Sequence, residues 1–290
     1  MQRIFVCISL MVCMILPISA YAQEKSEDKQ PAEQVQQKNS DVEKIAEVKV
    51  EKSPEEIKVA ELKTLLAKSD TLWKTRHKRG NDRQSVLLAE QYLEKGGDEF
   101  EGKWRIARGC FWVAEQSRDK KVKIIFGEKG WKAGERAAKL KPKRIEGWYW
   151  GVIALGQYSK GIGVAKAFFK GVAGTFEKMN KKAMEINQNY GYAGPSRSFG
   201  RYLFSVPWPK RDLKESAKLL EKSISLYPPK LRSYFYLAET YLALKEKDKA
   251  KAALDKCLSL DPKKEEYPDG IIFLEECKKL YAKEFGQEKK

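Results

Sequence analysis

The sequence predicts an all-α protein, built as an array of antiparallel helix pairs. From residue 53 onward, apolar residues recur every three or four positions, which is the spacing of a helix with one buried face. The breaks between these stretches are short and contain Gly, Pro or Asp. The segment 122–126 is the one strand-like run, and it fits inside a helix equally well. With 42% hydrophobic residues in a chain of 290, there is enough apolar material for a packed core.

The first 22 residues are predicted to be a signal peptide for export. Arg3 is followed by an apolar run over 4–18, and Ala20 and Ala22 give the small residues that signal peptidase recognises. An uncleaved membrane anchor is the alternative, because the run approaches the length of a bilayer-spanning helix. Residues 23–52 are rich in Glu, Lys and Gln and contain no aromatic residue, so we expect a disordered tether.

A helical repeat domain is predicted over residues 53–286. Ser53, Pro54 and Glu56 stand at the positions that cap and begin a helix. At the other end, apolar residues at helical spacing over 270–285 predict a last helix that covers the end of the array. The array therefore begins and ends with recognisable helix signals.

The clearest repeat lies at 231–264. A tetratricopeptide unit of 34 residues has aromatic or large apolar residues at positions 4, 7, 11 and 24, small residues at 8, 20 and 27, and Pro at 32. Counted from Leu231, these positions hold Tyr234, Leu237, Ala238, Tyr241, Ala250, Leu254, Cys257 and Pro262. The small residues allow two helix backbones to approach, and the aromatic residues fill the space beside them. On these residues the segment resembles a tetratricopeptide repeat.

Earlier units are less regular. The second-helix positions recur 34 residues upstream, as Ser216, Leu220, Ser223 and Pro228. The first helix of that unit departs from the pattern, because Pro207 and Pro209 are expected to end it early. Helix pairs of this kind bury a continuous core only as a stacked array, so several imperfect units beside one regular unit are coherent.

The middle of the chain carries further features. An aromatic helix at 148–151 is followed by a glycine break at 161–163, a long inserted helix from Val164 to Met184, and a turn into another helix at 194–201. With the segment 104–108, these features resemble two families built on tetratricopeptide repeats: the T-component proteins of TRAP transporters and the regulator-of-microtubule-dynamics-type proteins. The T-component resemblance implies a periplasmic scaffold that pairs with a solute-binding protein and can offer a route for a small organic acid. The chain lacks the lipoprotein cysteine that such envelope proteins often have.

Positive charge is concentrated in the same region. The net charge is +17, and residues 101–212 hold 24 Lys and Arg against 9 Asp and Glu, so 24 − 9 = +15 lies there. A basic field of this size attracts anionic partners, although a generally basic and soluble surface is the alternative. Because the chain is predicted to be exported, we expect no nucleic-acid partner.

Aromatic and arginine side chains of the middle region are the candidate binding residues. Arginines in an aromatic groove suit carboxylate recognition through paired N–H donors. The alternatives are ordinary packing for the aromatic rings and structural ion pairs for the arginines. The predicted binding residues are Arg108, Trp148, Trp150, Tyr190, Arg197, Arg201 and Trp208.

Catalytic and metal-binding motifs are not found in the sequence. His77 is the only histidine, so no serine or cysteine has an evident histidine base, and no metal or cofactor is expected. The glycines at 161–163 lack the strand and acidic residue of a nucleotide-binding loop. Cys110, Cys257 and Cys277 lie in apolar helical patterns, where we expect buried free thiols.

These observations predict a non-enzymatic, protein-binding scaffold of the periplasm or envelope, with a transporter's solute-binding protein as the candidate partner. One alternative is a protein that binds or relays a small organic acid or lipid. Another is a basic surface protein that attaches to anionic membrane or glycan, with membrane contact through that surface or an uncleaved signal.

Overall fold

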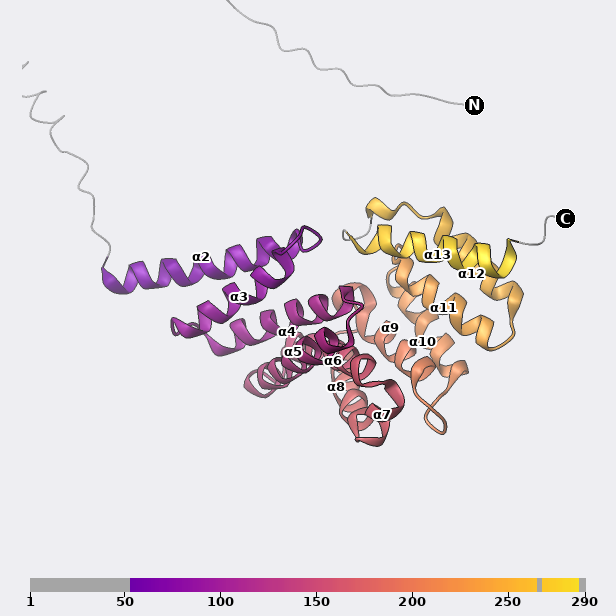
Figure 1. Ribbon diagram of the computed structural model, residues 1–290, viewed down its shortest axis with the longest axis horizontal. Coiled ribbons are helices and arrows are strands. Elements are labelled where there is room, and N and C mark those ends of the chain that lie inside the picture. The colour runs from indigo at the N-terminus through magenta and orange to yellow at the C-terminus, as the bar shows by residue number, and fades with distance from the viewer. Residues whose placement is uncertain (1–52, 265–267, 287–290) are drawn as a thin grey trace, which may run out of the picture. The chain divides into compact units, whose positions relative to one another are not determined.

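The computed structural model describes residues 53–264 and 268–286, which belong to one compact unit, Lys52–Lys290 (Figure 1). The predicted signal peptide and tether, 1–22 and 23–52, lie outside the described residues. Within them, the regular elements are helices and no strand is present. The helices are α2 Pro54–Lys74, α3 Asn81–Glu94, α4 Glu99–Gln116, α5 Lys120–Leu140, α6 Ile145–Ile162, α7 Val164–Phe169, α8 Val172–Ile186, α9 Tyr190–Ser205, α10 Leu213–Leu226, α11 Leu231–Ala243, α12 Lys247–Ser259, the short 3-10 turn Pro262–Lys264, and α13 Asp269–Phe285. Each of these helices is too short or too polar to cross a lipid bilayer.

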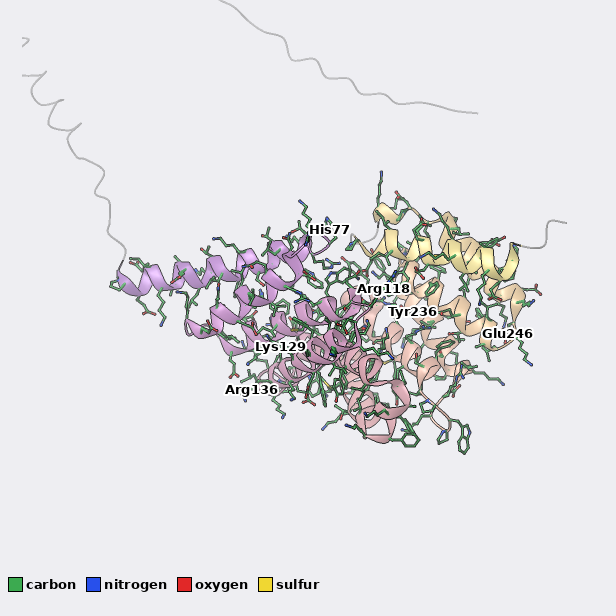
Figure 2. All side chains as sticks on the ribbon, viewed as in Figure 1. His77, Arg118, Lys129, Arg136, Tyr236 and Glu246 are labelled. Atoms are coloured by element: carbon green, nitrogen blue, oxygen red, sulfur yellow. A yellow bond between two sulfur atoms is a disulfide. The ribbon has the colours of Figure 1, made fainter. Side chains whose placement is uncertain are left out.

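The helices pack as successive antiparallel pairs. The pairs are α2 with α3, α4 with α5, α9 with α10 and α11 with α12, while α6 pairs with α8 across the short insertion α7. The first helix begins as its sequence predicts, because the Ser53 hydroxyl accepts from the Glu56 amide at 3.2 Å and the Glu56 carboxylate accepts from the Ser53 amide at 2.8 Å. The only histidine, His77, projects from the turn between α2 and α3 (Figure 2).

The regular unit α11–α12 is packed as the repeat pattern predicts. Ala238, Ala250 and Leu254 are fully buried between the two helices, and α13 covers the end of the pair. One expectation is wrong: Cys257 and Cys277 are joined by a disulfide rather than being free thiols. The sequence placed each cysteine on its own helix, and only the docking of α13 on α12 brings the two side chains together. Cys110 is a free and buried thiol, as expected.

The contact between α5 and α6 depends on glycine. A methyl group added to Gly134 would lie 2.3 Å from the Gly151 Cα atom, and one added to Gly147 would lie 2.4 Å from the Ala138 amide nitrogen. The two helix backbones therefore pack directly against each other. This close packing positions α6, which together with α9 contributes more residues than any other helix to the pocket described below.

The inserted segment differs from the prediction in one detail. The single long helix expected over 164–184 is divided into α7 and α8 at Lys170 and Gly171. Gly171 has a φ of +75°, a left-handed conformation that glycine adopts readily and that no α-helix can continue through. The chain therefore turns after Phe169, and α7 stands apart as a short separate helix. The glycine break at 161–163 is confirmed, because α6 ends at Ile162.

Candidate functional site

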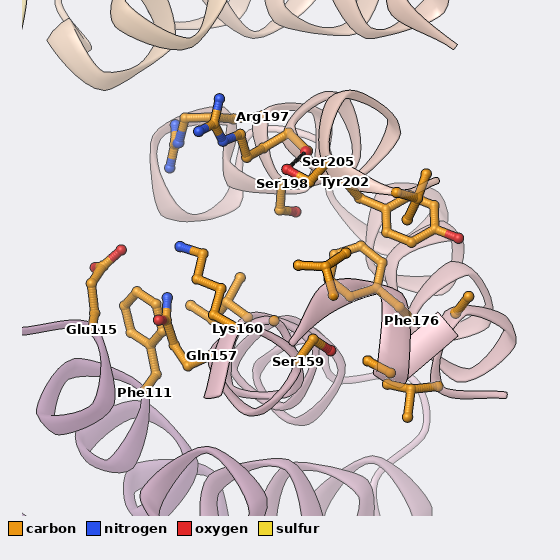
Figure 3. Close-up of a pocket in the computed structure, with 18 of the residues that line it drawn as sticks. Phe111, Glu115, Gln157, Ser159, Lys160, Phe176, Arg197, Ser198, Tyr202 and Ser205 are labelled. Atoms are coloured by element: carbon orange, nitrogen blue, oxygen red, sulfur yellow. Dashed lines mark hydrogen bonds between the residues drawn. The ribbon is translucent and has the colours of Figure 1, made fainter. Parts of the chain in front are cut away.

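A pocket of about 150 Å³ lies against the first helices of four successive pairs, α4, α6, α9 and α11, and is completed by α7 and α8 (Figure 3). It exists because the insertion of α7 places a short helix where a regular pair would bring its second helix directly against the first. The lining is divided chemically. One side is apolar, and the other carries charged and polar groups.

The apolar side is formed by α6, α7, α8 and the C-terminal end of α9. Phe176 stacks on Tyr202 with ring centroids 4.6 Å apart, and the Tyr202 hydroxyl donates to the Glu177 carboxylate at 2.7 Å. Burial and this hydrogen bond raise the pKa of Tyr202, so the phenol stays protonated at neutral pH. The apolar lining residues are Ile153, Val164, Ala167, Phe168, Val172, Ala173, Phe176, Tyr202 and Val206.

Two cations on the polar side have no carboxylate partner among the described residues. The amine of Lys160 is exposed and points into the space between Glu115 and Arg197 (Figure 3). Arg197 is only 6% exposed, and its guanidinium donates to the main-chain oxygens of Tyr192 at 2.6 Å and Gly191 at 3.0 Å. Positive charge therefore remains beside the apolar lining, which suits a ligand that carries one anionic group.

Arg197 also has a structural role. Gly191, Tyr192 and Ala193 all have a φ between +57° and +59°, which is a left-handed turn at the start of α9. Its guanidinium binds two carbonyl oxygens of this turn and so helps to hold it. Arg197 therefore has a structural role in the turn, in addition to lining the pocket.

Arg201 is paired. It donates to the Glu239 carboxylate at 2.7 Å and lies 4.5 Å from the Tyr236 ring centroid. Burial raises the pKa of Glu239, while Arg201 opposes that effect. This ion pair joins α9 to α11 at the edge of the pocket.

A buried ion-pair network closes another side of the pocket. Arg232 on α11 donates to both carboxylate oxygens of Glu115 on α4, at 3.0 and 3.1 Å, and to Asp269 on α13 at 3.3 Å. Lys230 binds the other oxygen of Asp269 at 3.0 Å. Burial alone would raise the pKa of Asp269, but Arg232 and Lys230 hold it well below its usual range. Residues 117 positions apart are thus held together, so α4 contacts α11 directly.

The other predicted binding residues lie outside the pocket. Arg108 is buried and donates to Asp70 at 2.6 Å. Trp150 donates to the Tyr190 hydroxyl at 2.9 Å inside an aromatic cluster, and Trp148 donates to the Pro142 carbonyl at 3.0 Å.

Of the seven predicted binding residues, only Arg197 and Arg201 line the pocket. Trp208 is 85% exposed on the loop after α9. Sequence reasoning missed Lys160, because its neighbouring glycines were interpreted only as a helix break. It also missed Arg232 and Glu115, whose pairing depends on contacts far apart in the chain.

Comparisons with known proteins agree with this architecture. Residues 65–207 match the family described as regulator of microtubule dynamics protein 1-3, and residues 231–264 match the tetratricopeptide repeat family. A comparison with curated proteins finds no match. TTC0263, a thermophilic tetratricopeptide-repeat protein of Thermus thermophilus, is 17% identical with a TM-score of 0.55, over 74% of this chain and 98% of that one.

Two further similar structures have lower TM-scores. MamA is 14% identical with a TM-score of 0.46, over 72% of this chain and 98% of that one. Yeast Tom70 is 15% identical with a TM-score of 0.30, over 79% of this chain and 62% of that one. The predicted fold class, an all-α array of tetratricopeptide-type helix pairs, is confirmed by the repeat match and by TTC0263. The resemblance to T-component proteins stays a prediction.

Proposed function

We propose that this tetratricopeptide-repeat protein is a non-enzymatic scaffold, exported to the periplasm or envelope, that holds a partner protein at the pocket. The observation that carries the proposal is the lining of the pocket by the first helices of four successive pairs. Stacked helical repeats bind their partners on the surface that these helices form. The T-component resemblance suggests a transporter's solute-binding protein as the class of partner.

The pocket's hydroxyl groups favour binding over catalysis. Ser159 and Ser205 donate to main-chain carbonyl oxygens, and Ser198 donates to the Asn180 side-chain oxygen and a main-chain carbonyl. A serine nucleophile needs a base that accepts its proton, and none of these bonds supplies one. Burial raises the pKa of the Cys110 thiol to about 12, which makes it unreactive at neutral pH.

The disulfide between Cys257 and Cys277 supports export. Structural disulfides persist in oxidising compartments such as the bacterial periplasm and are rare in the cytosol. The proposal therefore joins two independent features: the apolar, small-residue pattern of the first 22 residues and a disulfide at the opposite end of the chain.

The test is affinity purification of the tagged chain from envelope extract, with co-purifying proteins identified by mass spectrometry. Lys160→Glu reverses the exposed charge at the pocket, and Lys63→Glu makes the same change at an exposed position of α2 that does not line the pocket. We expect one stoichiometric partner that is lost with Lys160→Glu and kept with Lys63→Glu. A diverse set of proteins, recovered equally by all three chains, would contradict the proposal.

A small anionic ligand is the second candidate occupant. It is favoured by the volume of about 150 Å³ and by the two cations that have no carboxylate partner among the described residues. Titration calorimetry with carboxylates of increasing alkyl length tests it. We expect affinity to rise with chain length and to fall with Lys160→Glu, whereas the absence of heat from every carboxylate would exclude this candidate.

A further inference from the structure

Two aromatic side chains stand out from the surface. Phe169 is 83% exposed and Trp208 is 85% exposed, which makes them the most exposed large apolar side chains of the described residues. Rings of this size bury large areas when they find a partner, and their exposure in water marks a contact surface.

The two rings belong to one edge of the molecule. Phe169 ends α7, and Trp208 lies on the loop between α9 and α10. Ala167 of α7 and Val206 of that loop are buried in the same apolar cluster and line the same pocket. In Figure 1, α7 and the connection from α9 to α10 both lie at the lower edge of the array. We call the segments 164–170 and 206–211 the aromatic edge.

The charge of the aromatic edge is entirely positive. Its two segments contain no Asp or Glu, and its four charged residues are Lys166, Lys170, Lys210 and Arg211. Lys166 and Lys170 are exposed and form no ion pair with a described residue. Lys210 is partly neutralised by Glu177 at 2.8 Å.

This combination fits a lipid surface better than a protein groove. The rings belong to two separate elements and do not line the pocket, and a lysine follows each of them within two residues. Trp and other aromatic rings favour the interface between headgroups and acyl chains, while Lys and Arg near an anionic leaflet are attracted to its phosphates. Both requirements are met on one edge.

We propose that the aromatic edge docks on the surface of an anionic lipid bilayer. Phe169 and Trp208 enter the headgroup region, and the four basic residues lie against the lipid phosphates. The proposal is separate from the protein partner proposed above, because the two rings and the four basic residues that would contact lipid do not line the pocket. It predicts attachment to a membrane surface without a spanning helix.

The test is sedimentation with vesicles, using the full chain with its N-terminus as the cell leaves it. The vesicles contain either phosphatidylcholine alone or phosphatidylcholine with about one third phosphatidylglycerol. We expect binding to the anionic vesicles, and at least about a tenfold weaker partition coefficient for F169S/W208S, since two exposed rings no longer leave water. The charge reversal K166E/K170E should weaken binding by about as much, and added salt should weaken the binding of the parent chain to the anionic vesicles.

Matched controls separate the edge from the rest of the surface. Ile125→Ser removes an apolar side chain that is 61% exposed on α5, and K63E/K68E reverses two exposed charges on α2. Both should bind as the parent chain does. Hydrogen exchange gives a local signal, because amides in the aromatic edge should exchange more slowly on anionic vesicles.

Three results would overturn the proposal. The first is equal vesicle binding by F169S/W208S and the parent chain. The second is binding without slower exchange in the aromatic edge, which would place the contact elsewhere, such as the N-terminal segment. The third is that F169S/W208S no longer binds an envelope protein but still binds the vesicles, which would make the edge a protein interface.

Discussion

Replacing Arg232 with Ala should destabilise the helical array strongly, because it leaves buried carboxylates without their cation. The side chains of Arg232 and Glu115 are 11% and 15% exposed, and both guanidinium bonds to Glu115 would be lost. Removing one partner of a buried ion pair costs about 3–5 kcal/mol. Asp269 keeps Lys230 at 3.0 Å, so we expect the lower end, about 3 kcal/mol. For a unit of this size that corresponds to a Tm lower by about 6–12 °C.

The chain offers a matched control for this measurement. Arg136 also forms a two-bond contact with Glu99, at 2.8 and 2.6 Å, but these two side chains are 51% and 42% exposed. Arg136→Ala should therefore leave the urea midpoint almost unchanged, since water solvates the freed carboxylate. Equal destabilisation by Arg232→Ala and Arg136→Ala in urea unfolding would refute the argument that burial increases the free energy lost when the Arg232 ion pairs are broken.

A double-mutant cycle isolates the pair itself. Glu115→Gln keeps the shape of the side chain but removes its charge, and Arg232→Ala also removes a contact with the Phe273 ring at 4.5 Å. If the ion pair stabilises the contact between α4 and α11, the double mutant should be more stable than the sum of the two single changes predicts, by about 1 kcal/mol or more. Additive effects would show that Arg232 acts by packing alone.

Three further outcomes are expected. Because the pKa of Asp269 is depressed in the folded chain, its contribution to stability is present at neutral pH and is lost as the pH falls below about 4. The free energy of unfolding, measured with urea, should therefore fall less on acidification in Asp269→Asn than in the parent chain. Replacing Cys257 and Cys277 with Ser opens a loop of 20 residues and should lower the free energy of unfolding by about 3 kcal/mol, with faster hydrogen exchange in α13. Gly134→Ala places a methyl group 2.3 Å from the α6 backbone and should cost about 1–3 kcal/mol, whereas Gly174→Ala in α8 meets no atom within 4 Å and should stabilise by up to about 1 kcal/mol, both measured by thermal unfolding.

The regular part of the fold was predictable because its signals are local. Tyr234, Leu237 and Ala238 lie on one face of α11, and Ala250 and Leu254 lie on the facing side of α12, so their spacing alone describes how the pair packs. The cap of α2 is similarly local, since Ser53 and Glu56 are three residues apart. Such signals survive in a single sequence because each involves only one turn or one helix pair.

The candidate site was less predictable because it depends on distant contacts. Glu115 and Arg232 meet only when the intervening helix pairs curve enough to bring α4 to α11. Each of these residues is an ordinary charged side chain in its own helix. The predicted arginines illustrate the same limit: their type and region were identified, but Arg108 and Arg201 have carboxylate partners, Asp70 and Glu239, in other helices.

The pocket and the aromatic edge both involve the irregular middle of the chain, and one physical cause explains this. In a regular pair such as α11 and α12, the small residues at matching positions bring the two helices into direct contact. The turn at Gly171 instead separates α7 from α8, so α7 cannot pack as a full second helix. Its inward side then borders the pocket, and its outward end exposes Phe169. The departure from the repeat therefore creates both the cavity and the aromatic edge.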